Sequence, residues 1–326
     1  MRSTAWNIIT LFALWLLNTS VATANINEGK TMNDSNWSAN YFGRFEISLP
    51  KDSEIVADYK LLNEKLEFIS KNGRNDLPKL VAKQVEDLKK GIARGTSSRY
   101  EKTVQLDNDS VLLLSRLGDF YTFNVFLLTQ KNTLYHLMAK TISEKSIPGG
   151  IEKMRMLSNA IYFRRPEDAP PPGAFAIEAG YTTLPNDKFF ESIYMGAQIA
   201  GHPGTYISLL TKGILKKEQT LLERFDDRQY DSSLNELANS GRMQTLRKRK
   251  RSTGGISGEE VAVSTTIDGK TYYAFQFEYE GTIESNIHPY IAIELGTHEV
   301  GSNFKSDDEA LAFWDSLIDS FKPLPE

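Results

Sequence analysis

The sequence predicts an α+β protein of two domains, each a mainly antiparallel sheet with packed helices. Two observations lead to this fold class. Each half of the chain shows the same order of patterns: a strand, a helix, further strands and a closing helix before prolines. Neither half shows the alternating βαβ pattern of a doubly wound parallel sheet. The repeated order, and the likeness of residues 158–166 to residues 315–323, suggest that the domains arose by duplication.

Composition narrows the class of protein. The 326 residues are 40% apolar and 25% charged, which is ordinary for a globular protein and excludes disorder and polytopic membrane architecture. A net charge of −4 gives no electrostatic reason to expect nucleic acid as a partner. Cysteine is absent, so disulfides, thiolate metal sites and a thiol nucleophile are excluded.

Residues 1–24 have the pattern of a secretory signal peptide. Arg2 precedes an apolar stretch at residues 8–17, and Ala22 and Ala24 supply the small side chains before a cleavage site. The stretch is well short of the ~20 apolar residues that span a bilayer, which favours cleavage near Ala24 over an uncleaved anchor. We therefore expect an exported chain in the periplasm, without thiols and with no stable membrane insertion after cleavage.

The N-terminal domain is expected over residues 41–165, after a lead segment at residues 25–40. Its strands are predicted from alternating or continuous apolar residues, and its helices from apolar residues that recur on one face. The patterns predict, in order, a strand at 45–49, a helix at about 77–92, strands at 111–114, 120–128 and 133–138, and a closing helix around 151–161.

A proline-rich linker at residues 166–173 separates this domain from a C-terminal domain over residues 174–326. Prolines so dense favour an extended spacer and forbid a continuing helix. The Asp268-Gly269 pair predicts a type I′ hairpin turn, because both of its positions need a positive φ. The patterns predict a strand at 175–177, a helix from Phe189 to Ala200, a strand at 206–210, a hairpin over 261–279 and a strand at 290–295.

The last helix is predicted to begin after Ser306. Ser306 and Glu309 match a capping box, in which the hydroxyl accepts from the Glu309 amide and the carboxylate accepts from the Ser306 amide. An apolar stripe over residues 311–321 follows, and Pro323 ends the helix.

No motif for catalysis, cofactor binding or metal binding stands out. Residues 254–258 come closest to Gly-x-Ser-x-Gly, but their spacing is wrong and they are interpreted as a loop. The four histidines have no second ligand at the spacing of a helical zinc site. The adjacent carboxylates at 226–227 and 259–260 would face opposite ways on a strand. We therefore expect no catalytic residue, cofactor or metal, although carboxylates distant in sequence remain open as a glycosidase pair.

The unusual segment is Leu-Arg-Lys-Arg-Lys-Arg at residues 246–251. In an extended strand, Arg247, Arg249 and Arg251 lie on one face and the two lysines on the other. Guanidinium groups bind carboxylates in a bidentate fork, whereas lysine is a hydrated point charge. We therefore predict that the three arginines meet carboxylates, either in a protein partner that they bind or in this chain, and that the lysines are solvated.

Other interpretations of this basic segment remain open. It is also typical of a solvated edge strand whose charges discourage pairing with other chains, or of a surface that binds anionic lipid. Nucleic acid is disfavoured, because no aromatic residues are interleaved to stack on bases. The nearby acidic residues that could pair with it are Asp226, Asp227, Asp231 and Glu236.

Several segments carry a family resemblance. They are residues 42–50, 173–178, 258–260, 277–281, 289–295 and 306–315. With them, most of residues 40–326 resembles the immunity proteins that bacteria pair with type VI secretion phospholipase effectors. The resemblance implies a periplasmic, non-catalytic protein that binds and inhibits a cognate lipase effector. An exported hydrolase acting on envelope lipid or glycan and a periplasmic binding module remain as alternatives.

Overall fold

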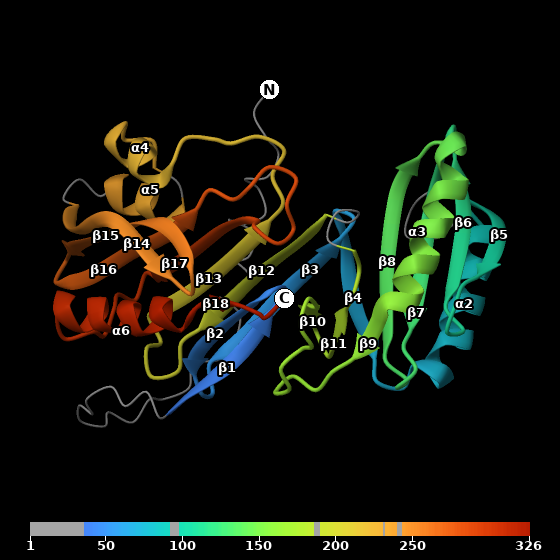
Figure 1. The fold of residues 1–326 in the computed structure, drawn as a ribbon, viewed down its shortest axis with the longest axis horizontal. Helices are drawn as coiled ribbons and strands as arrows, with labels where there is room; N and C mark the ends of the chain where they lie inside the picture. Colours follow the sequence, from blue (N-terminus) through green and yellow to red (C-terminus); the bar gives the residue numbers. More distant parts are fainter. Residues whose placement is uncertain (1–35, 92–97, 186–189, 231, 240–242) are drawn as a thin grey trace.

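The computed structural model describes residues 36–91, 98–185, 190–230, 232–239 and 243–326. Its main feature is a twelve-stranded sheet in which every neighbouring pair of strands is antiparallel (Figure 1). The predicted α+β class is confirmed. In sheet order the strands are β14 (Gln244–Thr253), β15 (Ile256–Ile267), β16 (Lys270–Tyr279), β17 (Tyr290–Thr297), β13 (Thr205–Lys212), β12 (Glu191–Gln198), β3 (Glu54–Leu61), β4 (Glu64–Ser70), β8 (Leu134–Ile142), β7 (Phe120–Leu128), β6 (Val111–Leu117) and β5 (Arg99–Gln105).

The two halves of the chain meet where β3 pairs with β12. The pairing runs without a break from Glu54 opposite Gln198 to Leu61 opposite Glu191, so one sheet crosses from the N-terminal to the C-terminal half (Figure 1). The division into domains at residues 166–173 stays a prediction. The signal peptide and residues 25–35 of the predicted lead segment lie outside the described residues.

The order of the strands repeats between the halves. The N-terminal order β3-β4-β8-β7-β6-β5 has its counterpart in β12-β13-β17-β16-β15-β14. Each half also supplies the last strand of the other half's small sheet. These small sheets are β1 (Trp37–Phe42), β2 (Phe45–Pro50) and β18 (Lys322–Pro323), and β10 (Phe175–Ile177), β11 (Gly180–Thr182) and β9 (Ile161–Phe163). This repetition favours the duplication hypothesis, which stays a prediction.

Helices cover both faces of the large sheet. In β6, Val111 and Leu113 join the apolar cluster under α2, whereas Leu112 and Leu114 join the main core on the other face, where α3 packs. The continuous apolar run of β6 is therefore explained by burial on both sides. The helices are α2 (Gly73–Lys89), α3 (Ile147–Ala160), α4 (Leu221–Asp226), α5 (Ser232–Asn239) and α6 (Asp307–Ser320), with a 3-10 turn at Glu144–Ser146.

The prediction of a helix from Phe189 to Ala200 is wrong. Residues 191–198 form β12, and Phe189 lies outside the described residues. Ile193, Met195 and Ala197 are buried, and the residues between them are partly exposed. Burial thus repeats every two residues, as in a strand with one covered face. Hydrogen-bonded neighbours on both sides, β3 and β13, complete the strand.

One helix start and one helix cap also differ from expectation. α2 begins at Gly73 rather than near residue 77, because the Gly73 amide donates to the carbonyl of Asn132 and a Cβ there would lie 2.6 Å from Leu128. Only glycine permits that close approach. At α6, Ser306 accepts from the Glu309 amide at 3.2 Å as predicted. The Glu309 carboxylate, however, accepts from the amide of Lys305 rather than of Ser306, so the second half of the capping box is wrong.

The β15–β16 hairpin is confirmed. Asp268 and Gly269 have φ angles of 50° and 77°, as a type I′ turn requires. None of the helices in the described part of the chain is long and apolar enough to cross a membrane.

Candidate functional site

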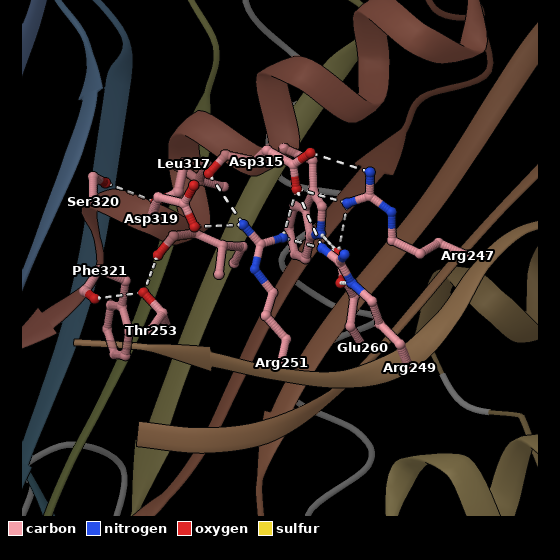
Figure 2. Close-up of polar contacts among 12 residues, drawn as sticks. Arg247, Arg249, Arg251, Thr253, Glu260, Asp315, Leu317, Asp319, Ser320 and Phe321 are labelled. Atoms are coloured by element: carbon pink, nitrogen blue, oxygen red, sulfur yellow. Dashed lines mark hydrogen bonds and ion pairs between the residues drawn. The ribbon is translucent and has the colours of Figure 1, made fainter. Parts of the chain in front are cut away.

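The three arginines of the basic segment lie side by side on β14 and face α6 (Figure 2). A register shift between Thr245 and Arg247 precedes them. They differ in accessibility: the side chain of Arg251 is 6% exposed, that of Arg247 20% and that of Arg249 48%. Arg249 is therefore the arginine of this set that a partner can reach most easily.

Glu260 of β15 is the buried anion at the centre of this group. Its side chain has no solvent exposure, and it accepts hydrogen bonds from Arg247 at 3.2 Å, Arg249 at 2.6 Å and Arg251 at 3.0 Å. The indole N–H of Trp314 donates to it at 2.7 Å. Burial alone would favour the protonated carboxyl. The bond from Arg249, the charge of Arg251 and the bond from Trp314 outweigh it and hold the pKa of Glu260 below its ordinary value.

Asp315 and Asp319 of α6 complete the group. The Asp315 carboxylate receives a two-pronged contact from Arg247, at 2.6 and 3.1 Å, and a third bond from Arg251 at 2.8 Å. Arg251 also donates to Asp319 at 2.7 Å (Figure 2). Asp315 and Asp319 are one helical turn apart, so both can face the same strand. These ion pairs join α6 to β14 and β15.

The lysine face of β14 is not simply solvated. Lys248 pairs with Asp226 of α4 and lies 6.0 Å from the centre of the Phe225 ring, whereas Lys250 is exposed. Of the acidic partners suggested by the sequence, Asp226 thus binds a lysine, and Asp227 accepts from the side chain of Gln219. Asp231 and the side chain of Glu236 lie outside the described residues.

A second surface, which the sequence did not predict, lies on the middle strands of the large sheet. Strand registers trace one face across the whole sheet. From under α4 and α5 this face runs through Val261, Gln276, Glu294, Ser208, Gly196 and Val56. It continues through Lys60 and Lys65, and then through Glu67, His136, Phe126 and Val111 under α2. α2 and the α4–α5 pair therefore lie at the two ends of the same face.

Between these helices the alternate side chains of four strands are partly or fully exposed. We call this surface the central face. It consists of Val56, Asp58 and Lys60 of β3; Ser192, Tyr194 and Gly196 of β12; Tyr206, Ser208, Leu210 and Lys212 of β13; and Tyr290, Ala292 and Glu294 of β17.

The central face combines aromatic rings with charges of both signs. Tyr194 lies near the carboxylates of Glu294 and Asp58, and burial together with those charges raises its pKa to about 12. Asp58 pairs with Lys65 at 2.7 Å. At the other side, the Lys212 ammonium lies 5.3 Å from the centre of the Tyr290 ring. Tyrosine rings with polar edges on exposed strands are typical of surfaces that bind proteins.

The described residues hold no group of three or more His, Asp or Glu side chains that could bind a metal ion. Residues 254 and 255 form the tight turn between β14 and β15, where both glycines have a positive φ.

Residues 170–326 match the family model of the Tle cognate immunity protein 4 C-terminal domain. The apo immunity protein TplEi of the type VI secretion system from Pseudomonas aeruginosa is 27% identical, with a TM-score of 0.80 over 90% of this chain and 99% of that chain. No curated protein sequence matches.

Two further solved structures are similar. The Tle4–Tli4 complex gives 27% identity and a TM-score of 0.79, over 90% of this chain and 99% of that chain. TplEi from Pseudomonas aeruginosa complexed with "L" peptide gives 27% identity and a TM-score of 0.75, over 90% of this chain and 100% of that chain.

The family match and the similar solved structures together support the class of type VI secretion lipase immunity proteins, which confirms the resemblance found in the sequence. The family match covers residues 170–326, which are just under half of the chain.

Proposed function

We propose that this chain is a non-catalytic immunity protein that binds a cognate phospholipase effector of the type VI secretion system and blocks it in the periplasm. The observation that carries the proposal is the match in fold to Tli4 as it occurs in the Tle4–Tli4 complex, over 90% of this chain. The family match of residues 170–326 supports it independently.

The central face is the surface that we assign to the effector. It spans four strands from both halves of the chain and is bordered by α2 at one end and by α4 and α5 at the other. A tight protein complex buries about 800 Å² on each partner. Four neighbouring strands of eight residues span roughly 500 Å², because strands are spaced about 4.8 Å apart and each residue advances about 3.3 Å. The central face can therefore supply the larger part of such an area.

The second part of the proposal is a partner role for Arg247, Arg249 and Arg251. The accessibility of their side chains decides which of them can contact a partner. Arg247 and Arg251 serve mainly to fix α6, since their guanidinium groups are engaged by Glu260 and Asp315. Arg249 is half exposed, so it is the one that we assign to effector binding. Its side chain lies on the face of the sheet opposite the central face, so this contact requires an effector that also reaches around the edge strand β14.

Two features support export and a non-catalytic role. The pattern of residues 1–24 predicts a cleaved signal peptide, which would place the mature chain on the side of the membrane where such an antidote is needed. The sequence also lacks a nucleophile motif of the Gly-x-Ser-x-Gly type.

The test is a phospholipase assay with the purified mature chain and its cognate phospholipase effector. We expect the chain alone to release no fatty acid, and to suppress the activity of the lipase at a stoichiometric ratio. Phospholipase activity of the chain itself, lost on replacing a single Ser, Asp or Glu, would favour the exported hydrolase. No effect on the lipase and tight binding of a small solute would favour the periplasmic binding module.

A further inference from the structure

The segment that follows α6 reaches from the C-terminal half of the chain to the N-terminal half (Figure 1). We call residues 322–326 the latch segment. Four of its five residues are exposed, and an exposed segment of this kind is ordered only where its backbone is tied down. Here Lys322 and Pro323 pair with Glu46 and Phe45 of β2, and the Lys322 ammonium lies 3.1 Å from the Glu46 carboxylate.

Beyond this pairing, three hydrogen bonds form a closed cycle through the latch segment. The Leu324 amide donates to the carbonyl of Arg44 at 2.8 Å. The Arg44 Nη1 atom donates to the carbonyl of Gly173 at 2.9 Å, and the Gly173 amide donates to the carbonyl of Pro325 at 2.8 Å. Because Leu324 and Pro325 are neighbours in the chain, the cycle joins the N-terminal half, the end of the predicted linker and the latch segment.

The same guanidinium group also binds the first residue of β12. The Nε and Nη2 atoms of Arg44 donate to the two carboxylate oxygens of Glu191 at 2.7 and 3.0 Å, and both residues are buried. Glu191 lies opposite Leu61, so this ion pair stands at one end of the β3–β12 pairing that joins the halves. A two-pronged contact between arginine and carboxylate fixes geometry, so the position of Arg44 is coupled to that of β12.

The linker predicted from its prolines is therefore held at both ends. At its end, Gly173 is part of the hydrogen-bond cycle. At its start, the buried Arg164 donates through Nη1 at 2.7 to 3.1 Å to three backbone carbonyls, those of Arg165, Pro166 and Asp168. A hinge needs residues that are free to change their backbone angles. A linker bonded at both ends to buried arginines does not meet that condition.

A cavity of about 430 Å³ lies beside the latch segment, at the junction of the two halves. Arg44 and Phe45 line it from the N-terminal half, Tyr279 and Ile291 line it from the C-terminal half, and residues 323–326 form a further wall. Without that wall, the cavity would open to water next to Arg44. Water raises the local dielectric constant and so weakens an ion pair such as that of Arg44 with Glu191.

We propose that the latch segment locks the two halves into one rigid body and keeps the linker from acting as a hinge. This inference goes beyond the proposed function, because it concerns the chain without a partner. A rigid junction also serves that function. The central face takes its strands from both halves, and a surface that is already formed binds at a lower cost in ordering.

The experiment deletes residues 324–326 from the mature chain and follows hydrogen exchange by mass spectrometry. This deletion removes the two bonds that the latch segment contributes to the cycle, and it leaves Lys322 and Pro323 paired with β2. Deletion of Glu326 alone is the matched control, because the Leu324 amide and the Pro325 carbonyl then stay in place. Circular dichroism checks that both variants fold.

We expect the longer deletion to speed exchange about tenfold at the junction, because the lost hydrogen bonds oppose local opening there. The junction segments to be followed are residues 43–46, 173–177 and 190–193. Residues 111–114 of β6 lie far along the sheet, and their exchange should not change. The Glu326 deletion should leave exchange unchanged in all four segments.

If the longer deletion does not fold, Leu324→Pro takes its place. Proline has no amide hydrogen, so this variant removes one donor of the cycle and should speed exchange at the junction about threefold. A folded variant of either kind whose junction exchanges as slowly as that of the wild type overturns the latch. No effector is added in this experiment, so its result does not depend on the proposed function.

Discussion

Glu260 of β15 and Trp314 of α6 are joined by a 2.7 Å hydrogen bond, in which the indole N–H donates to a carboxylate that has no solvent exposure. Trp314 is itself completely buried. The bond therefore ties the closing helix to the sheet in the interior, where a polar contact without a partner is most costly. Arg251 extends the same connection by contacting both Glu260 and Asp315.

Removing the charge at the centre of this group should destabilise the fold. Glu260→Gln keeps an oxygen for Trp314, but it leaves Arg251, which is 6% exposed, without its buried anion. Breaking a buried ion pair by removing one partner costs about 3–5 kcal/mol, and we expect about 3 kcal/mol because Asp315 and Asp319 still contact Arg251. Denaturant unfolding followed by tryptophan fluorescence measures the change.

The matched control is Glu280→Gln. Glu280 pairs with Lys217 at 2.8 Å, but both side chains are about half exposed. Exposed pairs contribute little to stability. Equal losses in the two variants would mean that burial of Glu260 does not determine its effect.

Acid should weaken the attachment of α6. The pKa of Glu260 is lowered as described above, and for Asp315 burial is outweighed by the bond and charge of Arg247, so its pKa is lowered too. On acidification the unfolded chain takes up protons first, near the ordinary values of about 3.9 for Asp and 4.3 for Glu. The stabilisation from both groups is thus fully present above about pH 5 and is lost as the pH falls below about 4.

Unfolding free energies between pH 3 and pH 6 provide the measurement. We expect the unfolding free energy to fall less between pH 6 and pH 3 in Glu260→Gln than in the wild type, because the variant has one fewer carboxylate to protonate. If the unfolding free energy falls with the same slope below pH 5 in both proteins, Glu260 has the same pKa in the folded and the unfolded chain.

Glu191 should have the opposite pH dependence. Its carboxylate is bound by Arg44 at 2.7 and 3.0 Å, yet burial outweighs the arginine and raises its pKa to about 6. Folding therefore favours the protonated form, and stability from this group falls as the pH rises from about 4.5 to 6. The unfolding free energy of the wild type minus that of Glu191→Gln should therefore fall over that interval and stay constant from pH 7 to pH 8. A difference that does not change between pH 4.5 and pH 7 would contradict the raised pKa.

Arg249 offers the most direct test of the arginines in effector binding. Arg249→Gln removes an accessible charge, and rim charges act mainly on the rate of association. We expect association with the lipase to slow about threefold at low salt, with the difference fading near 0.5 M salt because of screening. Lys250→Gln, an exposed residue on the other face of β14, should have a much smaller effect. Equal rates for Arg249→Gln and the wild type would leave this arginine with a structural role alone.

Export can be tested separately. Replacing Ala22 and Ala24 by leucine should leave an unprocessed precursor, because signal peptidase requires small side chains before the cleavage site. Mass spectrometry of the periplasmic fraction measures the mature N-terminus. A native chain that still carries residues 1–24 would contradict cleavage and restore the anchor interpretation.

Local patterns in the sequence were sufficient for elements that have one covered face or a clear turn. The β15–β16 hairpin follows from Asp268-Gly269, and α6 from Ser306 and its apolar stripe. β12 was wrongly predicted as a helix, although its buried residues alternate with partly exposed ones such as Tyr194 and Gly196. Pairing with β13, the next strand along the chain, and with β3, more than a hundred residues away, completes the strand.

Contacts between distant residues also limited what could be predicted of the candidate site. Alternation in β14 was enough to place the three arginines on one face, but not to find their partners. Glu260 lies on the next strand and Asp315 on a helix more than sixty residues further along the chain. The central face could not be predicted at all, since it exists only once β17, β13, β12 and β3 are known to be neighbours.

The most direct test of the account is hydrogen exchange on the mature chain with and without its cognate phospholipase effector. We predict that binding slows exchange in β3, β12, β13 and β17 and along the side of α2 that borders the central face. Protection confined to α3 and the small sheets on the opposite face, with β12 and β13 unchanged, would contradict the assignment of the central face as the effector-binding surface.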